Sequence, residues 1–431
     1  MDTDNRIPAT EGLSASLVED SSTRVFSLDS GEKMNYFCKQ KCGILNREYN
    51  GEWRSSARAL KNADQSRVHL LEGLRPPKNP SGPPPPAMDP GKLLRDADPL
   101  LKFLDGFGFR SWKISFRCLS QRRLVLVRGR PGINNRFDHF SLVIRAALPH
   151  MRSPVEVGEG STRSFRFNLT GLQARIEDMA ENHRGARPVD YGRKLPVVLG
   201  AGDGAIVLHE ILGHSLEADH IHRGMSVFSI DDLGRRVVSP GVTLKVRDGN
   251  DSFFAGLASD DEGEEAMPVT LVEEGVLRGF ISDFFYRRLL GMPFSGHSRV
   301  QDYTRIPMPR MYALYLAAGQ SDREELIRSI RFGIFAKEFG EGKVLFRKNL
   351  FYFYIRQATL IERGRLTQPL GGIYVSGRID EVLNSIAMVA SDFSHDKGIS
   401  YCNKNGQTLN VRVGQPTVRI DNMWVSRGGN D

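Results

Sequence analysis

Two histidines flank a glutamate in the segment Leu208-His209-Glu210-Ile211-Leu212-Gly213-His214, an HExxxH motif. Imidazole is the commonest protein ligand of zinc, and a carboxylate beside the metal can act as a general base. The familiar zinc-peptidase helix has only two residues between its glutamate and its second histidine. With three residues there, the two histidine side chains would diverge by roughly 140° on a regular helix. Both can reach one metal ion only if the turn widens into a π-bulge, which Gly213 permits.

A catalytic zinc site needs a third protein ligand and leaves its fourth position to water. The candidates near the motif are Glu217, Asp219, His220 and His222, and the distant candidate is Cys402 in a loop rich in glycine and asparagine. A reduced cysteine in such a loop is more commonly an ordinary buried residue. The residue types alone therefore leave the third ligand open.

A glycine-rich turn, Gly200-Ala201-Gly202-Asp203-Gly204, joins the strand expected at Leu195 to Leu199 to the histidine helix. The turn is similar to a dinucleotide-binding loop, but it lacks the usual spacing of the third glycine, and no acidic residue ends a second strand. The glycines more simply allow a tight turn into the helix. We therefore favour a metal site over a nucleotide site.

The expected helices and strands predict an α+β fold. We expect two domains, because a chain of 431 residues exceeds the size of most single hydrophobic cores. Residues 1–88 carry little pattern and end in a proline-rich linker, so we expect a divergent or partly disordered region. Residues 89–190 predict an α/β N-terminal domain, with helices at 93–104 and 168–179 and strands between them. Residues 191–431 predict a β-rich C-terminal domain that carries the HExxxH helix. Two further helices are expected in it, one from a capping box at Ser321 to residue 331 and one at 379–388.

The composition narrows the class of protein. No run approaches the roughly 20 apolar residues of a membrane helix, and the acidic, polar start shows no signal peptide. Four cysteines in so long a chain predict a reducing cytoplasm and no disulfide framework. The net charge of +8 comes from scattered Arg and Lys residues without a basic stripe interleaved with aromatic residues. We therefore expect a solvated basic surface and no direct binding to nucleic acid or to a membrane.

The C-terminal half resembles the TldD/PmbA family of metallopeptidases, cytoplasmic proteins first described as modulators of DNA gyrase. The resemblance is carried by motifs that follow one another in the family's order: Val197–Gly202, His209–Glu217, Arg223–Ser229, Asp260–Gly263, Pro307–Met311, Gly406–Leu409 and Val413–Thr417. The chain departs from the family's usual residues at Glu264–Glu265, Gly340–Lys343 and Arg356–Ala358. Residues 89–190 fit the family's N-terminal domain only in outline.

In the TldD branch of this family, two histidines and a loop cysteine bind the metal, and the glutamate is catalytic. The resemblance therefore implies zinc ligands at His209, His214 and Cys402 and a catalytic role for Glu210. The PmbA, or TldE, branch lacks the motif and partners the active subunit, so this chain resembles the active, TldD-like subunit. The implied assembly is a homodimer or a heterodimer with a PmbA/TldE-like subunit, and the implied substrate is a peptide.

The implied reaction is hydrolysis of small or unstructured peptides, in which zinc activates a water molecule and Glu210 takes its proton. We expect Glu217 or Asp219 to orient a ligand imidazole through its second nitrogen. Further candidates for contact with the substrate are His297, Tyr303 and Arg310.

Two alternatives to a general peptidase stay open. The chain could be a non-catalytic partner that keeps zinc as a structural clamp, which predicts a fourth protein ligand at His220 or His222. It could also be a specialised peptidase that matures a peptide natural product.

Overall fold

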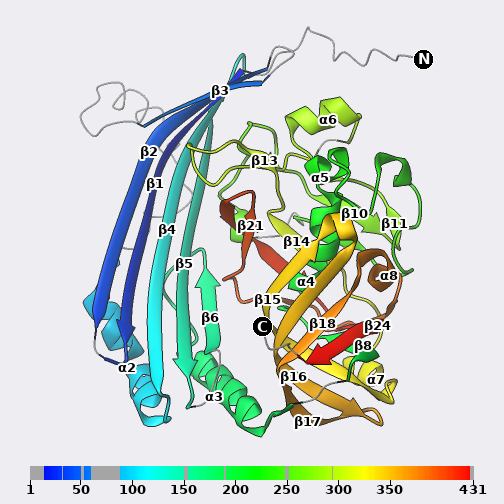
Figure 1. The fold of residues 1–431 in the computed structure, drawn as a ribbon. Helices are drawn as coiled ribbons and strands as arrows, with labels where there is room; N and C mark the ends of the chain where they lie inside the picture. Colours follow the sequence, from blue (N-terminus) through cyan, green and yellow to red (C-terminus); the bar gives the residue numbers. More distant parts are fainter. Residues whose placement is uncertain are drawn as a thin grey trace.

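A computed structural model describes residues 14–31, 33–49, 53–59, 88–149, 154–188, 191–247, 252–293 and 295–427 of the chain. These residues form a mixed α/β protein, in which a long N-terminal sheet stands beside a more compact C-terminal half (Figure 1). The proline-rich linker expected before residue 88 lies outside them. None of their helices is long and apolar enough to cross a membrane.

The N-terminal half contains an antiparallel sheet of six strands in the order β3-β2-β1-β4-β5-β6. Its strands are β1 (Ser14–Asp29), β2 (Met34–Tyr49), β3 (Trp53–Ala59), β4 (Ser111–Val127), β5 (Ile133–Ala147) and β6 (Val155–Ser161). Since β1 pairs with β4 from Ala15 to Asp29, the sheet runs across the boundary expected at residue 88. The strands β1 to β3 lie where the sequence predicts no element.

Two helices cover one face of this sheet, α2 (Pro90–Gly106) and α3 (Leu169–Gly185) (Figure 1). Both were expected from their apolar spacing, and α3 continues for six residues beyond the predicted end at 179. Asn168 caps α3, because its side chain accepts a hydrogen bond from Gly171 N. Alternate strand residues point to opposite faces, so one face of the sheet meets these helices and the other faces the C-terminal half.

The core beneath the helices is formed by apolar residues from one face of the sheet and from both helices. Its members include Leu100, Leu104, Phe116, Phe140, Leu142, Leu172 and Ile176, all at most 2% exposed.

An eight-stranded sheet dominates the C-terminal half, in the order β15-β8-β24-β18-β16-β17-β7 with β19 paired to β24. Its strands are β7 (Arg187–Pro188), β8 (Arg193–Leu199), β15 (Phe332–Leu345), β16 (Leu350–Glu362), β17 (Arg365–Gly371), β18 (Ile373–Arg378), β19 (Ile386–Val389) and β24 (Val418–Arg427). The strand β8 lies inside this sheet, between β15 and β24. Its last three residues, 197–199, are fully buried and lead through the glycine-rich turn into the HExxxH segment.

A six-stranded sheet and two short hairpins complete the C-terminal half. The order β11-β10-β9-β14-β23-β20 comprises β9 (Leu244–Val246), β10 (Val269–Glu273), β11 (Val276–Leu277), β14 (Ala313–Leu316), β20 (Ser394–His395) and β23 (Arg412–Gln415). The hairpins are β12 (Ser298–Arg299) with β13 (Met308–Pro309), and β21 (Tyr401–Lys404) with β22 (Gln407–Asn410).

The C-terminal helices are short. They are α4 (Ala205–Leu208), α5 (Ala218–His222), α6 (Phe284–Leu290), α7 (Arg323–Arg328) and α8 (Ile379–Leu383), with turns of 3-10 helix at η2 (His214–Leu216), η3 (Ile230–Asp232), η4 (Ser252–Phe254) and η5 (Phe346–Lys348). The predicted start of α7 at Ser321 is wrong, because Asp322 accepts hydrogen bonds from the first amides of the helix. The predicted end of α8 at 388 is also wrong, since Ile386 pairs with Ile420 as the start of β19.

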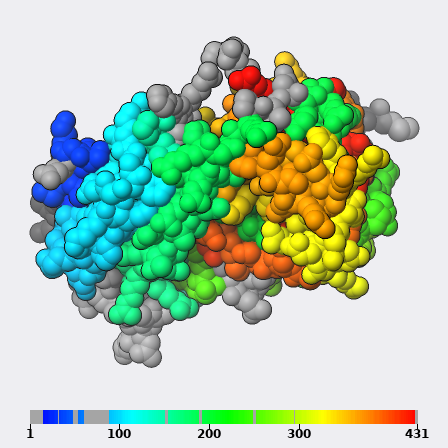
Figure 2. Space-filling model, turned by 90° about the horizontal axis from the view of Figure 1, so that it is seen from below, coloured from blue at the N-terminus to red at the C-terminus, as the bar shows by residue number. Residues whose placement is uncertain are grey.

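The helix α3 contacts both halves of the molecule. Arg175 Nη2 lies 3.3 Å from Glu338 Oε1, and Lys337 Nζ lies 2.5 Å from Asp178 Oδ2, so both pairs join α3 to β15. Figure 2 shows the green segment that contains α3 packed between the cyan N-terminal residues and the orange C-terminal strands.

Candidate metal centre

The HExxxH segment is helical, but its turns change in width. One α-helical turn, α4, is followed by a π-helical turn, η1 (His209–Gly213), and then by the 3-10 turn η2. The amide of His214 donates to the carbonyl oxygen of His209, which is the i+5 to i bond of a π turn. This bond brings the two imidazole rings to one side of the helix, with centroids 5.0 Å apart.

Gly213 is needed at this turn for packing. Its backbone is ordinary right-handed helix, with φ of −56°, so the turn itself does not demand glycine. A methyl group on Gly213 would instead overlap the sulfur of Met311. Close packing, and not the conformation of the widened turn, therefore requires glycine here.

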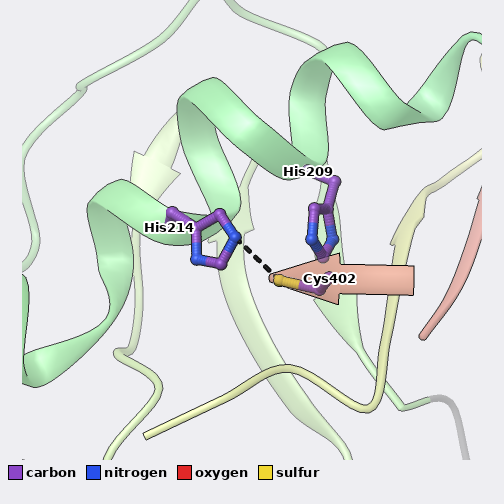
Figure 3. A group of neighbouring side chains, drawn as sticks. All are labelled: His209, His214 and Cys402. Atoms are coloured by element: carbon purple, nitrogen blue, oxygen red, sulfur yellow. Dashed lines mark hydrogen bonds between the residues drawn. The ribbon is translucent and has the colours of Figure 1, made fainter. Parts of the chain in front are cut away.

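The hairpin β21–β22 brings Cys402 to the two histidines (Figure 3). Cys402 Sγ lies 3.1 Å from His214 Nε2. One ligand atom each from His209, His214 and Cys402 lie within 4.8 Å of one another. All three residues are buried, at 0%, 4% and 2% exposure.

The donor atoms of this cluster fit a zinc ion. Within the described part of the chain, both ring nitrogens of His209 are buried without a hydrogen-bond partner, which is a rare and costly state for an imidazole. Two imidazoles and a thiolate are among the ligand types that zinc prefers. Burial alone would raise the pKa of Cys402, but His214, His209 and Arg310 hold it well below its usual range. The thiolate that a metal needs is therefore favoured.

Glu217 forms a hydrogen bond with Nδ1 of His214, the ring nitrogen that does not face Cys402. Its Oε2 lies 2.7 Å from His214 Nδ1 and 2.7 Å from Lys404 Nζ. Burial alone would raise the pKa of Glu217, but the charges of His214 and Lys404 lower it far below its usual range. A carboxylate that accepts a hydrogen bond from a ligand imidazole fixes the ring's tautomer and orientation.

Lys404 is a site residue that the motifs do not reveal. Besides Glu217, its ammonium group contacts Asp219 Oδ1 at 2.6 Å and the carbonyl oxygen of Pro309 at 3.3 Å. Asp219 and Glu217, together with His220, also form a group with the geometry to hold a metal ion, but Lys404 already supplies the positive charge there. The signal in the sequence is its spacing, because residues two apart in a strand share one face, and Cys402 lies two residues before it.

Glu210 is the one charged residue of the motif that reaches solvent. Its side chain is 29% exposed, and its Oε2 lies 3.9 Å from His214 Nε2. The carboxylate thus lies beside the cluster of ligand atoms without being one of its three members.

Arg310, His297 and Tyr303, the candidates for contact with the substrate, are all buried, and each has a different environment. Arg310 donates to the carbonyl oxygens of Cys402, at 2.7 Å, and of Gln407, at 3.3 Å, so it anchors the hairpin. His297 is fully buried against Tyr312, and burial lowers its pKa to about 3. Tyr303 belongs to an apolar cluster between the two halves and is not brought to the three ligands.

His220 and His222 are both engaged elsewhere. His220 Nδ1 lies 2.9 Å from the carbonyl oxygen of His214, and the His222 ring packs against Tyr286. Among the described residues, neither joins His209, His214 and Cys402 in the same group. Over the residues that the structure describes, the geometry offers three protein ligands and does not offer the fourth ligand of a closed clamp.

Comparisons with known proteins agree on one family. The model of the PmbA/TldA metallopeptidase C-terminal domain matches residues 192–427. The chain is 40% identical to the metalloprotease TldD homologue of Haemophilus influenzae over 271 residues, 63% of this chain and 55% of that protein. It is 30% identical to the zinc metalloprotease TldD homologue of Saccharolobus solfataricus over 258 residues, 60% of this chain and 56% of that protein. The chain therefore spans about half the length of the curated relatives that it matches.

A solved structure shares the fold over nearly the whole chain. The crystal structure of TldE from Thermococcus kodakarensis superimposes with a TM-score of 0.73, covering 96% of this chain and 97% of that one, at 14% identity. The family model, in contrast, matches in sequence and over more than half of the chain. The chain therefore belongs to the TldD/PmbA family of metallopeptidases.

Proposed function

We propose that the chain is a zinc-dependent peptidase of the TldD-like, active branch, which hydrolyses small or unstructured peptides. The observation that carries the proposal is the position of Glu210. Its partly exposed carboxylate lies beside three buried donor atoms from His209, His214 and Cys402. A base that reaches solvent next to a three-ligand set is what metal-assisted hydrolysis requires.

His209, His214 and Cys402 would hold the zinc ion. The name of the Saccharolobus solfataricus relative, a zinc metalloprotease, supports the choice of metal. When bound, zinc lowers the pKa of water and polarises the scissile carbonyl group. The chain's own residues keep the ligands in place, since Glu217 orients the His214 ring and Arg310 fixes the backbone of Cys402.

Glu210 acts as the general base and then as the general acid. Its carboxylate takes a proton from water and delivers it to the amine that leaves when the peptide bond breaks. Its exposure allows a substrate to approach, whereas its neighbours in the site are buried. Contact of Arg310, His297 or Tyr303 with the substrate is less well supported, because all three are buried.

We also propose an oligomeric state and a cellular location for the enzyme. The likeness to the TldE fold supports a dimer with a PmbA/TldE-like subunit or with a second copy of this chain. A cytoplasmic location would keep Cys402 reduced, as a thiolate ligand of a metal must be. General peptide turnover and maturation of a peptide natural product would use the same chemistry.

The test compares the chain with its Glu210→Gln variant. Metal content is measured by mass spectrometry, and cleavage of an unstructured peptide library is followed at fixed protein concentration. We expect about one zinc per chain in both proteins and at least a roughly 100-fold loss of cleavage in the variant. The matched control is Glu273→Gln, which removes an exposed carboxylate that pairs with Arg278 and should leave both readouts unchanged.

Cleavage by Glu210→Gln at the parent rate would show that this residue is not the base. A parent chain with neither metal nor cleavage would overturn the proposal and favour a binding role.

A further inference from the structure

A cavity of about 290 Å³ separates the N-terminal sheet from the C-terminal half. The hairpin β21–β22 forms part of its wall through Tyr401, Thr408 and Asn410. Side chains alternate along a strand, so Tyr401 faces away from the side of the hairpin that carries Cys402. Leu409, which pairs with Cys402 in the hairpin, also lines the cavity, so the hairpin forms the boundary between the cavity and the candidate metal centre.

Strand register places a row of polar side chains on the opposite wall. Ser21 pairs with both Lys41 and Gln121, and Arg123 pairs with Asn135, so these residues share one face of β2, β1, β4 and β5. All five line the cavity. A face that only packs against another domain would be expected to carry apolar residues at such positions.

The acidic residues of the cavity already have basic partners. Arg123 lies 2.9 Å from Asp261 and 3.5 Å from Glu19, and Lys41 pairs with Asp302. These contacts neutralise the acids of both walls. Asp261 also lies close enough to raise the pKa of Arg299, but its ion pair is with Arg123.

Two arginines in the cavity wall have no carboxylate partner among the described residues. Arg299 donates to the carbonyl oxygens of Met311 and Asn410, and its guanidinium lies 4.2 Å from the centroid of the Tyr312 ring. Arg117 lies 5.1 Å from the centroid of the Tyr401 ring. Burial lowers the pKa of Arg299 to about 10, which reflects the cost of keeping this charge away from water.

Two N–H donors at the cavity also lack acceptors. Asn410 is 5% exposed, and its Nδ2 has no hydrogen-bond partner in the described part of the chain. The same holds for Nε of Arg117. Buried donors without acceptors are rare in folded proteins, and beside two guanidinium groups that form no ion pair among the described residues they call for an anionic acceptor.

We propose that this cavity binds the carboxylates of an acidic peptide, with Arg117 and Arg299 as counter-ions and Asn410 as a hydrogen-bond donor. The volume lies at the lower end of small-ligand pockets, which suits two or three residues. Leu119, Phe137 and Tyr312 also line the cavity and would cover the apolar part of such a ligand, which a bare phosphate does not have. The inference rests on the proposed function only in naming a peptide as the carrier of the carboxylates.

The test is calorimetric titration of the full chain with N-acetyl-triglutamate, with N-acetyl-triglutamine and with inorganic phosphate. We expect the glutamate peptide to bind at least 10-fold more tightly than either comparison ligand. The variants Arg117→Gln and Arg299→Gln should each weaken its binding at least 10-fold. Arg128→Gln removes an exposed charge just beyond β4 and should leave the affinity unchanged.

Arg117 is only half-buried and lies on the sheet surface, so its variant keeps the test valid if Arg299→Gln fails to fold. Equal binding of the glutamine peptide, no binding by the parent chain, or an unchanged affinity in Arg117→Gln would each overturn the proposal. Phosphate that binds as tightly as the peptide would overturn the assignment to peptide carboxylates. Because calorimetry needs no hydrolysis, a chain that binds the peptide without cleaving any substrate rejects only the proposed function.

Discussion

Lys404 Nζ donates to Glu217 Oε2 at 2.7 Å, and the same oxygen lies 2.7 Å from His214 Nδ1. A single strand therefore supplies both the sulfur of the candidate metal centre, from Cys402, and the charge that neutralises its buried carboxylate. Since Lys404 also contacts Asp219, the hairpin is tied to the histidine helix at two points.

Replacement of Lys404 by methionine should destabilise the chain strongly. Its side chain is 5% exposed, and its loss leaves the carboxylates of Glu217 and Asp219 buried without this partner. Removing one partner of a buried ion pair costs about 3–5 kcal/mol, whereas an exposed pair contributes about 1 kcal/mol or less. The control is Lys194→Met, which breaks the exposed pair with Glu381. Urea denaturation measures both, and equal losses would show that Lys404 is not a buried counter-charge.

Metal binding should depend on Cys402 in a way that spectroscopy can detect. We expect the chain to take up one Co²⁺ with the near-ultraviolet absorption of a thiolate ligand, and Cys402→Ser to lose that absorption. Glu217→Gln should keep the absorption but weaken Co²⁺ binding about 10–100-fold, because Glu217 orients the His214 ring and is not itself one of the three candidate ligands. Cys38→Ser, at an exposed cysteine, serves as the control. An unchanged spectrum in Cys402→Ser would remove this residue from the ligand set.

The sequence predicts the histidine turn because the spacing itself requires it. An i, i+5 pair cannot share a ligand on a regular helix, and the structure has a π turn at His209–Gly213. The packing requirement for glycine at position 213 could not be predicted, since it comes from Met311, in the segment between β13 and β14. Lys404 could not be predicted as buried either, because its acidic partners lie 185 and 187 residues away in the chain.

The strands β1 to β3 carry no clear apolar alternation, which explains why they were missed. Positions such as Glu19, Ser21 and Lys41 face the polar cavity, so the usual signal of apolar residues at every second position is absent. In β1, Phe26 packs in the core beneath the helices whereas Ser21 lines the cavity, so this strand lacks the pattern of a half-buried sheet, and residues 54–59 of β3 are all exposed.

We expect Arg123 to stabilise the chain by joining the N-terminal sheet to the C-terminal half. Its guanidinium contacts both carboxylate oxygens of Asp261, at 2.9 and 3.0 Å, and lies 3.5 Å from Glu19. Arg123→Met should therefore cost about 3–5 kcal/mol in the free energy of unfolding. Arg130→Met is the matched control. Arg130 follows β4 and also forms an ion pair with the C-terminal half, at Glu264, but its side chain is 52% exposed. A loss in Arg123→Met no larger than in the control would contradict a buried bridge between the halves.

Asp396 should make the chain less stable as the pH rises. Burial raises the pKa of Asp396 to about 6, although Arg412 and the hydrogen bond from Ser400 oppose the shift. A carboxyl group whose pKa is higher in the folded state stabilises the fold fully below about pH 4, and this contribution is lost as the pH rises through 6. Asp396→Asn stays neutral, so it should match the parent chain near pH 4 and exceed its stability by up to ~3 kcal/mol above pH 7.

Asp302 should affect the pH dependence of stability in the opposite direction to Asp396. Burial alone would raise the pKa of Asp302, but hydrogen bonds from Lys41 and Thr304 lower it to about 2. Its stabilising contribution is therefore present above about pH 4 and is lost as the pH falls towards 2. Asp302→Asn should be less stable than the parent at pH 7, with a difference that shrinks in acid. Denaturation curves of the three proteins at matched pH values measure both effects. If the difference between Asp396→Asn and the parent did not grow between pH 4 and pH 7, the raised pKa of Asp396 would be wrong, because only the ionisation of that carboxyl group separates the two chains.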